Sequence, residues 1–299
     1  MAKLGFLGLG IMGAPMAKHL VDAGFSVAVW SHSAGKAEQL ASQGAIACKT
    51  PAEVAKHSDC IFLCVGNTAM SREVILGKDG LVQGAKAGTV IADCSTVSPS
   101  ESRAIGVELA KHGIHFLDTP CTGSRGGAES GKLTFMVGGD KAIFEKITPY
   151  LNAMGTQLYY CGAAGMGLHA KLSQNLILGN LVQAFNESLV LATKAGVDPE
   201  VMLDILNNSA ARSGVVALKA PMVFKGDFST NFSVKWLEKD LQLMLDSAAE
   251  MNIPLPLTAL SCQMYRAAIA QGFGEEDICG SIRVLEGLTG SKVRVAPKK

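Results

Sequence analysis

Lys3-Leu-Gly-Phe-Leu-Gly-Leu-Gly-Ile-Met-Gly13 joins a short apolar run to a glycine-rich turn, and a stretch with helical spacing, residues 14–23, follows at once. A strand, a G-x-G-x-x-G turn and a helix in this order are typical of a βαβ unit that binds a dinucleotide. In such a unit we expect Gly8 to permit the tight turn, Gly10 to let the backbone approach a pyrophosphate, and Gly13 to let helix and strand pack closely. The N-terminus of the helix then supplies N–H groups to the phosphates. The predicted phosphate-binding residues are Gly8, Leu9, Gly10, Ile11, Met12 and Gly13.

Short apolar runs alternate with amphipathic stretches of helical period as far as Tyr160, which is the pattern of successive βαβ units. The apolar runs have no polar side, so helices are expected to cover both faces of the predicted sheet. The predicted strands are residues 4–7, 26–30, 60–65, 89–93, 115–117, 134–137 and 157–160. The predicted helices are residues 14–23, 36–42, 52–57, 100–111 and 142–154. The pattern therefore predicts the α/β class, with a doubly wound Rossmann-type parallel sheet.

Strand-like runs disappear after Met166, and the rest of the chain is predicted to be helical. The helices expected there are residues 168–195, 199–207, 231–251, 256–271 and 277–288. A glycine-rich stretch separates the two patterns, so we place a domain boundary near residue 164. We expect an NADP-binding Rossmann domain over 1–164 and an all-helical substrate and dimerisation domain over 165–299. The long helix at the start of the second domain is apolar all round, which predicts burial on nearly every side, in part against a second subunit.

The composition argues against several classes of protein. The chain has 299 residues, of which 48% are hydrophobic and 18% are charged, and its formal net charge is +1. Disorder requires low hydrophobicity with high net charge, and nucleic-acid binding requires clustered Lys and Arg, so neither is expected. The mean hydropathy is +0.26, but no run approaches the roughly 18 to 20 uninterrupted apolar residues of a membrane-spanning helix. The N-terminus lacks the pattern of a signal peptide, so we expect a cytoplasmic protein without membrane contact.

No metal site is predicted. The eight cysteines form no CxxC pair, and several lie inside apolar runs, where a thiol behaves as a small hydrophobic group. The histidines are isolated, and no spacing of His, Asp and Glu suggests a set of metal ligands. We expect reduced, mostly buried cysteines.

The end of the second predicted strand governs the choice between NAD and NADP, because an NAD site places Asp or Glu there for the ribose 2′-hydroxyl. Here the sequence has Ser31, His32 and Ser33, with Lys36 shortly after. A carboxylate would repel a 2′-phosphate, whereas hydroxyls, an imidazole and a lysine can bind one. We therefore predict that NADPH is the preferred cofactor and that NAD can also be used.

Five motifs, in order, resemble those of a known family. They are Gly8-Leu-Gly-Ile-Met-Gly-Ala-Pro-Met-Ala-Lys18, Asp93-Cys-Ser-Thr96, Asp118-Thr-Pro-Cys-Thr-Gly-Ser124, Gly167 with Lys171 and Asn175, and Lys239-Asp-Leu241. Over nearly its whole length the chain resembles the β-hydroxyacid dehydrogenase family. That family includes 3-hydroxyisobutyrate dehydrogenase, tartronate semialdehyde reductase and the glyoxylate/succinic semialdehyde reductases.

Lys171 and Asn175 are four residues apart on a predicted helix, so both side chains project from one face and can reach one substrate atom together. The resemblance implies that Lys171 is the general acid and base, and that Asn175 orients the substrate oxygen. Burial can adapt a lysine to this task by disfavouring its charged form.

The resemblance also implies that Thr122, Gly123 and Ser124 bind the substrate carboxylate through hydroxyl and N–H groups. Most relatives have Ser-Gly-Gly there and the glyoxylate/succinic semialdehyde branch has Ser-Gly-Ser, so Ser124 favours that branch. The branch usually continues with a lysine-rich, proline-containing run, and this chain has Arg-Gly-Gly-Ala instead. Arg125 is either a partner for a distal carboxylate or an arginine of a solvent-facing loop.

Further cofactor residues are expected after two other strands. By resemblance, Thr96 lies by the nicotinamide ribose or carboxamide with Ser95 beside it, and the turn of Val65 and Gly66 lies near the adenosine. Lys239 resembles a lysine that reaches the cofactor and the active-site cleft from the helical domain. Phe232 is expected to form a wall of that cleft, so both are also candidate substrate-binding residues.

The leading hypothesis is an NADPH-dependent reductase of small aldehyde acids, such as succinic semialdehyde, glyoxylate or tartronate semialdehyde, that works reversibly on the hydroxy acids. A 3-hydroxyisobutyrate-type dehydrogenase is the alternative enzyme, and such enzymes usually keep Ser-Gly-Gly. Imine reductases share the architecture but typically replace the lysine by Asp or Tyr, so Lys171 argues against them. A non-catalytic cofactor-binding scaffold is the alternative of another class, and it predicts a substituted position 171. We expect a small-molecule substrate and a homo-oligomer, either a dimer or a tetramer.

Overall fold

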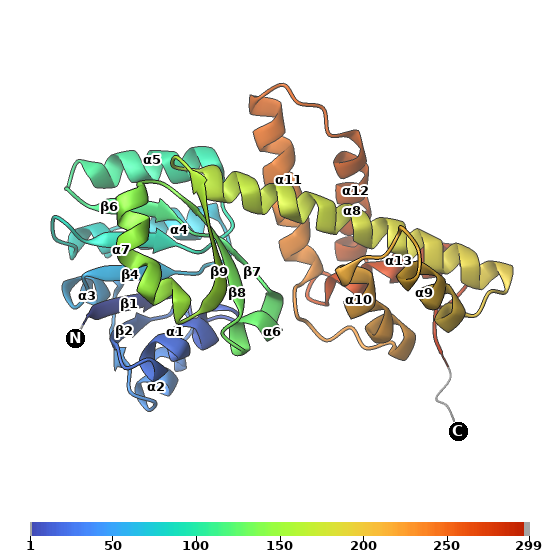
Figure 1. Ribbon diagram of the computed structural model, residues 1–299, viewed down its shortest axis with the longest axis horizontal. Helices are drawn as coiled ribbons and strands as arrows, with labels where there is room; N and C mark the ends of the chain where they lie inside the picture. The colour runs from blue at the N-terminus through green and yellow to red at the C-terminus, as the bar shows by residue number, and fades with distance from the viewer. Residues whose placement is uncertain (1, 296–299) are drawn as a thin grey trace. The chain divides into compact units, whose positions relative to one another are not determined.

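The structure, a computed structural model, describes residues 2–295 and divides into two compact units that meet in the chain between Lys171 and Leu172 (Figure 1). The first unit contains a nine-stranded sheet with the order β3-β2-β1-β4-β5-β6-β8-β7, in which β9 pairs with β8. Its strands are β1 (Lys3–Leu7), β2 (Ser26–Trp30), β3 (Ile46–Ala47), β4 (Cys60–Leu63), β5 (Val90–Asp93), β6 (His115–Asp118), β7 (Cys121–Thr122), β8 (Leu133–Gly138) and β9 (Gly155–Gly162). Its helices are α1 (Gly13–Asp22), α2 (Lys36–Ala41), α3 (Pro51–Lys56), α4 (Thr68–Leu76), η1 (Leu81–Gln83), α5 (Pro99–Ala110), α6 (Ser124–Glu129) and α7 (Lys141–Asn152). The predicted α/β class with a doubly wound Rossmann-type sheet is confirmed.

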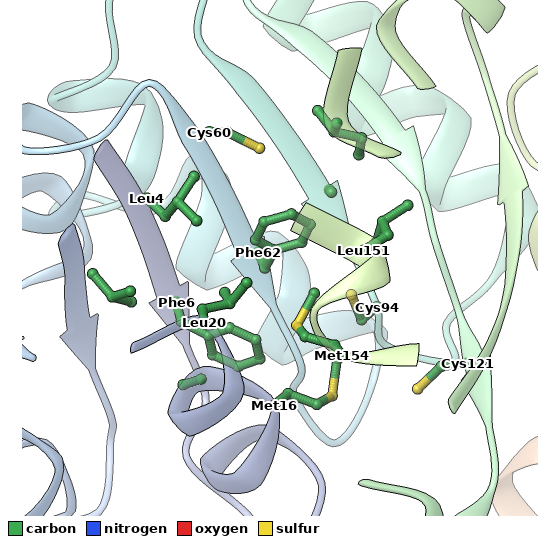
Figure 2. Close-up of a cluster of buried hydrophobic side chains, with 14 of the residues drawn as sticks. Leu4, Phe6, Met16, Leu20, Cys60, Phe62, Cys94, Cys121, Leu151 and Met154 are labelled. Carbon is green, nitrogen blue, oxygen red and sulfur yellow. The ribbon is translucent and has the colours of Figure 1, made fainter. Parts of the chain in front are cut away.

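Helices cover both faces of this sheet. Alternate residues of each strand point to opposite faces, and apolar side chains on both faces are buried under helices. One core lies between the sheet and helices α1, α2 and α7. Figure 2 shows part of it, with Leu4 and Phe6 of β1 and Phe62 of β4 near Met16 and Leu20 of α1. The other core lies between the sheet and α3, α4 and α5. The residues that these three helices contribute are Val54, Ala55, Val74, Ile75, Ile105 and Leu109.

The sheet is parallel from β3 to β6 and mixed beyond that point. Strand β8 runs antiparallel to both β6 and β7, and β9 runs parallel to β8. An antiparallel edge on an otherwise parallel sheet is common in doubly wound folds. The predicted parallel sheet therefore ends in a mixed edge, where β8 lies beside β6 and runs in the opposite direction.

The second unit is helical. It contains most of α8 (Met166–Ala195), followed by α9 (Pro199–Asn207), α10 (Gly214–Lys225), α11 (Val234–Glu250), α12 (Pro256–Ala270), η2 (Ile278–Ser281) and α13 (Ile282–Thr289). One apolar cluster lies between α8, α11 and α12, and a second lies between α8, α10 and the segment that begins at η2. The buried Tyr265 of α12 donates a hydrogen bond to the carbonyl oxygen of Gly179 at 2.9 Å. Helix α8 is therefore the element that both clusters share.

One side of α8 is exposed. Ile177, Leu181 and Leu191 are 60%, 37% and 72% exposed. At about 100° per residue these three side chains lie, with Ala184, along one stripe of the helix. The expectation that this helix is buried on nearly every side is therefore wrong for the single chain.

By length and mean hydropathy alone, Met166–Lys194 is apolar enough to cross a membrane, and 39% of its most apolar window is buried. This is weak evidence for a membrane span, because a core helix of a helical domain meets the same criterion. Helix α8 also buries polar side chains, which are Asn175, Gln183 and Asn186. Its composition is therefore accounted for by the two apolar clusters and by the exposed stripe.

Candidate active site

The glycine-rich turn between β1 and α1 requires glycine at two of its positions. Gly8 has a φ angle of +88°, and a Cβ atom there would lie 2.2 Å from the carbonyl oxygen of Cys64. A Cβ atom on Gly13 would lie 1.9 Å from the carbonyl oxygen of Gly8, so the first turn of α1 packs directly on the end of β1. Gly10 differs, because it is exposed and a Cβ atom there would meet nothing within 4 Å. The turn leaves space beside the backbone of Gly10, which fits the close approach of a dinucleotide pyrophosphate.

Two other predicted cofactor turns follow neighbouring strands at the same edge of the sheet. Strand β1 lies between β2 and β4, where the strand order reverses, and parallel strands place their carboxyl ends together. Val65 and Gly66 follow β4, and Ser95 and Thr96 follow β5. The N–H of Val65 donates a hydrogen bond to Ser95 Oγ at 2.8 Å. The structure therefore brings these two turns into direct contact.

The residues expected to select between NAD and NADP lie on the surface. Ser31, His32 and Ser33 follow β2 at the same edge of the sheet, and His32 and Ser33 are exposed. Lys36 begins α2 and lines a groove of about 350 Å³ together with Gly10 and other residues of α1 and α2. The structure thus places Lys36 beside the glycine-rich turn.

Helix α8 begins against the sheet, where the carboxylate of Asp118 at the end of β6 holds it. Asp118 is 1% exposed and accepts hydrogen bonds from the N–H groups of Gly165 at 2.7 Å and Leu168 at 2.9 Å. Burial raises the pKa of the Asp118 carboxyl, and these N–H groups act in the opposite direction. A Cβ atom on Gly167 would lie 2.4 Å from the carbonyl oxygen of Met136, so this close approach of helix and sheet requires glycine. The start of α8 is therefore fixed on the sheet by polar and steric contacts.

Lys171 lies on α8, about one turn after Leu168, and is only 7% exposed. Burial raises the pKa of the Cys121 thiol to about 11, and the nearby positive charge of Lys171 acts in the opposite direction. Cys121 directly precedes Thr122 on β7. The positive charge of Lys171 therefore acts on the residue that directly precedes the predicted carboxylate turn, within the first unit.

The turn after Thr122 has an unusual backbone. Gly123 has a φ angle of +138° and Ser124 one of +54°, a region that favours glycine. Residues held in this region concentrate at functional sites. The next residue, Arg125, is exposed, and its Nε donates to Glu129 Oε1 at 2.7 Å. In this structure Arg125 therefore forms an exposed ion pair within α6.

In the second unit, Asn175 is held by a carboxylate that the sequence analysis did not single out. Asn175 is 1% exposed, and its Nδ2 donates a hydrogen bond to Asp240 Oδ2 at 2.6 Å. Because a carboxylate accepts hydrogen bonds and donates none, Asp240 fixes the orientation of the amide. Asn175 Oδ1 is buried and has no hydrogen-bond partner within residues 2–295, so it remains an acceptor.

Lys239 shares this carboxylate. Its Nζ lies 2.9 Å from Asp240 Oδ1, and its side chain is 20% exposed. The position of Asp240 directly after Lys239 in the fifth motif is the signal from which sequence reasoning could have found it.

Phe232 lies in the segment that leads into α11, and its backbone is held from a distance in the chain. The N–H groups of Asn231 and Phe232 donate to Asp277 Oδ2 at 3.0 and 3.2 Å. Asp277 is fully buried, and its Oδ1 lies 2.7 Å from the Nζ atom of Lys219, which is also buried. A buried ion pair therefore fixes the segment that carries Phe232.

Two protein families match successive parts of the chain. Residues 3–162 match a family described as the NAD binding domain of 6-phosphogluconate dehydrogenase. Residues 165–285 match a family described as NAD-binding of NADP-dependent 3-hydroxyisobutyrate dehydrogenase.

Individual proteins match over nearly the whole chain. The sequence is 40% identical over 294 residues to 2-(hydroxymethyl)glutarate dehydrogenase from Eubacterium barkeri, with 97% of each chain covered. It is 34% identical to glyoxylate/succinic semialdehyde reductase 2, chloroplastic, from Arabidopsis thaliana, with 98% of this chain and 81% of that protein covered. The solved structure of Mycobacterium tuberculosis 3-hydroxyisobutyrate dehydrogenase with L-serine superposes with a TM-score of 0.87 at 29% identity, covering 95% of this chain and 99% of that one. The chain therefore belongs to the β-hydroxyacid dehydrogenase family and is an NAD(P)-dependent oxidoreductase.

Proposed function

We propose that this enzyme is an NADPH-dependent reductase that converts small aldehyde acids to hydroxy acids and works in reverse on the hydroxy acids. The observation that carries the proposal is the nearly buried Lys171, whose positive charge acts on Cys121, the residue before the Thr122–Ser124 turn. A lysine beside a turn that offers hydroxyl and N–H groups suits a substrate that combines a carbonyl with a carboxylate. The glycine-rich turn, with its open space at Gly10, supports a dinucleotide as the second reactant.

In this proposal each residue has one task. NADPH supplies the hydride when it is bound. Lys171 Nζ donates a proton to the carbonyl oxygen and takes it back in the reverse direction. Asn175 accepts a hydrogen bond from the hydroxyl of the hydroxy acid through Oδ1, and the hydrogen bond from Nδ2 to Asp240 holds the amide in place. The Thr122–Ser124 turn holds the carboxylate, which orients the carbonyl for both transfers.

The preference for NADPH follows from the absence of a carboxylate among Ser31, His32 and Ser33. We expect kcat/KM for NADPH to exceed that for NADH in steady-state assays of the purified enzyme. Ser31→Asp introduces a like charge next to the 2′-phosphate, so it should shift the ratio toward NADH by about tenfold or more. A wild-type kcat/KM for NADH equal to or above that for NADPH would contradict the preference.

The substrate is tested with a panel. Succinic semialdehyde, glyoxylate and tartronate semialdehyde are assayed with NADPH and with NADH, and the expected result is a clear preference for one of them with NADPH. Equal and weak rates on all three would point to a substrate outside this set.

Two dehydrogenase activities are the other candidates. The 40% identity to 2-(hydroxymethyl)glutarate dehydrogenase favours that hydroxy acid as a substrate, and 3-hydroxyisobutyrate remains the alternative from the sequence motifs. Both are tested as oxidations with NADP+ and NAD+. A kcat/KM above that of every aldehyde acid in the panel would favour the dehydrogenase concerned.

Gly10→Ala is expected to raise the Kd for NADPH about tenfold or more while leaving the melting temperature unchanged. The added methyl group meets no protein atom within 4 Å, but it occupies the space through which the pyrophosphate would reach the backbone. Fluorescence titration of NADPH measures the Kd. Gly287→Ala is the matched control, because a Cβ atom there also meets nothing within 4 Å, and it should bind as the wild type does. Tight binding by Gly10→Ala would place the pyrophosphate elsewhere.

We also propose a cytoplasmic homo-oligomer, either a dimer or a tetramer. The support is the exposed stripe of Ile177, Leu181, Ala184 and Leu191, which extends over about 20 Å of α8 at 1.5 Å per residue. Exposed apolar surface of this kind marks an interaction site. A second copy carries the same stripe, so a two-fold contact would cover both.

A further inference from the structure

Asp93 is a buried carboxylate at the carboxyl end of β5, and none of the tasks above uses it. Its side chain is 1% exposed. Oδ2 accepts a hydrogen bond from the hydroxyl of Ser71 on α4 at 2.5 Å, and Oδ1 accepts one from the N–H of Ser95 at 2.8 Å. Ser71 and Ser95 are themselves 0% and 2% exposed. Asp93 therefore joins α4 to the turn that follows β5, inside the first unit.

The network continues into the turn that follows β4. Ser95 forms two of these hydrogen bonds, because its N–H donates to Asp93 and its Oγ accepts from the N–H of Val65 at 2.8 Å. A further hydrogen bond joins the segment after β5 to the start of α4, since the N–H of Ser98 donates to Thr68 Oγ1 at 3.0 Å. The turns after two neighbouring strands thus share one network, with Asp93 at its base.

A carboxylate in this place is costly to the fold. The pKa of Asp93 is raised to about 6, above all by burial; the hydrogen bonds of Ser71 and Ser95 act to lower this pKa, and the neighbouring Asp118 on β6 acts to raise it. The buried thiol of Cys94 is a further ionisable group beside it. A neutral side chain of the same shape would be buried at lower cost. Asp93 is therefore a candidate for a functional role.

We propose that Asp93 is a positioning residue for the cofactor, which fixes the Val65–Gly66 and Ser95–Thr96 turns relative to one another and to α4. The proposal rests on the proposed function, in which both turns contact the cofactor. Turns that are already in place bind a ligand without the ordering cost that mobile turns carry. Loss of the network should therefore weaken cofactor binding before it affects proton transfer by Lys171.

The first test is the Kd of NADPH for purified variants, measured by fluorescence titration. Asp93→Ala removes both hydrogen bonds and should raise the Kd about tenfold, and Ser71→Ala removes one and should raise it about threefold. Ser58→Ala is the matched control. Ser58 is also buried, and its hydroxyl donates to the carbonyl oxygen of Val54 at 2.7 Å, ahead of β4 at the opposite edge of the sheet. Its Kd should equal that of the wild type.

A pH series separates positioning from general loosening. An ionised carboxylate forms stronger hydrogen bonds than a neutral group, so the contribution of Asp93 should be lost as the pH falls through about 6. Asp93→Asn lacks this charge. Every other titrating group, including the 2′-phosphate of NADPH, is the same in the measurements on the variant and on the wild type. The ratio of the two Kd values, variant over wild type, should fall from about threefold at pH 7.5 to near one at pH 5. A ratio that does not change with pH would contradict the role of the charge.

The outcomes distinguish this inference from the proposed function. If the wild-type protein binds neither NADPH nor NADH, the proposed function is wrong and the inference falls with it. If the wild type binds while Asp93→Ala and Ser71→Ala bind equally tightly, Asp93 is not a positioning residue and the proposed function stands. Should Asp93→Ala fail to fold, Ser71→Ala decides, because it leaves the carboxylate in place.

Discussion

Purified Lys171→Ala enzyme is expected to reduce its aldehyde acid about 10²- to 10⁴-fold more slowly than the wild type, a loss of about 3 to 5.5 kcal/mol in activation free energy. The substitution removes the group proposed to donate the proton. It leaves the glycine-rich turn unchanged, so the Kd for NADPH should stay within about twofold of the wild type. The measurement is the single-turnover rate of NADPH oxidation at saturating aldehyde acid, with the Kd determined separately.

Two further variants separate the proton from the charge and from the helix. Lys171→Arg keeps a positive charge, but a guanidinium group does not release its proton at neutral pH, so this variant should be nearly as slow as Lys171→Ala. Lys194→Ala removes another lysine of α8, whose Nζ donates to the carbonyl oxygen of Thr289 at 2.8 Å, and it should keep the wild-type rate. Retention of more than half of the activity by Lys171→Ala would show that another group supplies the proton.

Helices and strands with a clear local sequence pattern were predictable. Strand β2 and helix α9 were predicted with the bounds that the structure gives. Strands β3 and β7 have two residues each, which is too short to produce a pattern. Helix α6 contains two consecutive glycines within six residues, and α10 contains Pro221, so local propensity argues against both. Tertiary contacts stabilise these helices, and one sequence does not show such contacts.

Some residues of the candidate active site were likewise predictable from local patterns and others were not. The glycine-rich turn, the residues after each strand and the four-residue spacing of Lys171 and Asn175 are local patterns. The contacts of the buried Asp118 and Asp240 are not, although both residues stand in the quoted motifs, because these contacts join residues that are distant in sequence. Asp118 accepts hydrogen bonds from N–H groups 47 and 50 residues later, and Asp240 binds an amide 65 residues earlier. The sequence around such an aspartate does not distinguish it from an exposed aspartate.

A large effect on stability is expected from Lys219→Met, which should lower the free energy of unfolding of the second unit by about 3 to 5 kcal/mol. The side chains of Lys219 and Asp277 are 3% and 0% exposed, and Lys219 Nζ lies 2.7 Å from Asp277 Oδ1. Removal of the lysine leaves a buried carboxylate without its counter-charge. The backbone N–H groups that still donate to this carboxylate are those of Asn231, Phe232 and Cys279.

Urea unfolding can be followed in the second unit alone, because Trp30 and Trp236 are the two tryptophans and Trp30→Phe leaves only the second. Lys235→Met is the matched control in this background. Lys235 forms an ion pair with Glu275, and the two side chains are 37% and 79% exposed. It should change the free energy of unfolding by less than about 1 kcal/mol.

The double variant Lys219→Met/Asp277→Asn removes the lysine and the charge that it balances. It should recover part of the lost stability, because the cost of Lys219→Met comes from an uncompensated buried charge more than from lost packing. No recovery would assign the loss to packing of the lysine stem. If Lys219→Met were as stable as the exposed control, the ion pair would not hold the segment that carries Phe232, and another contact would have to order the start of α11.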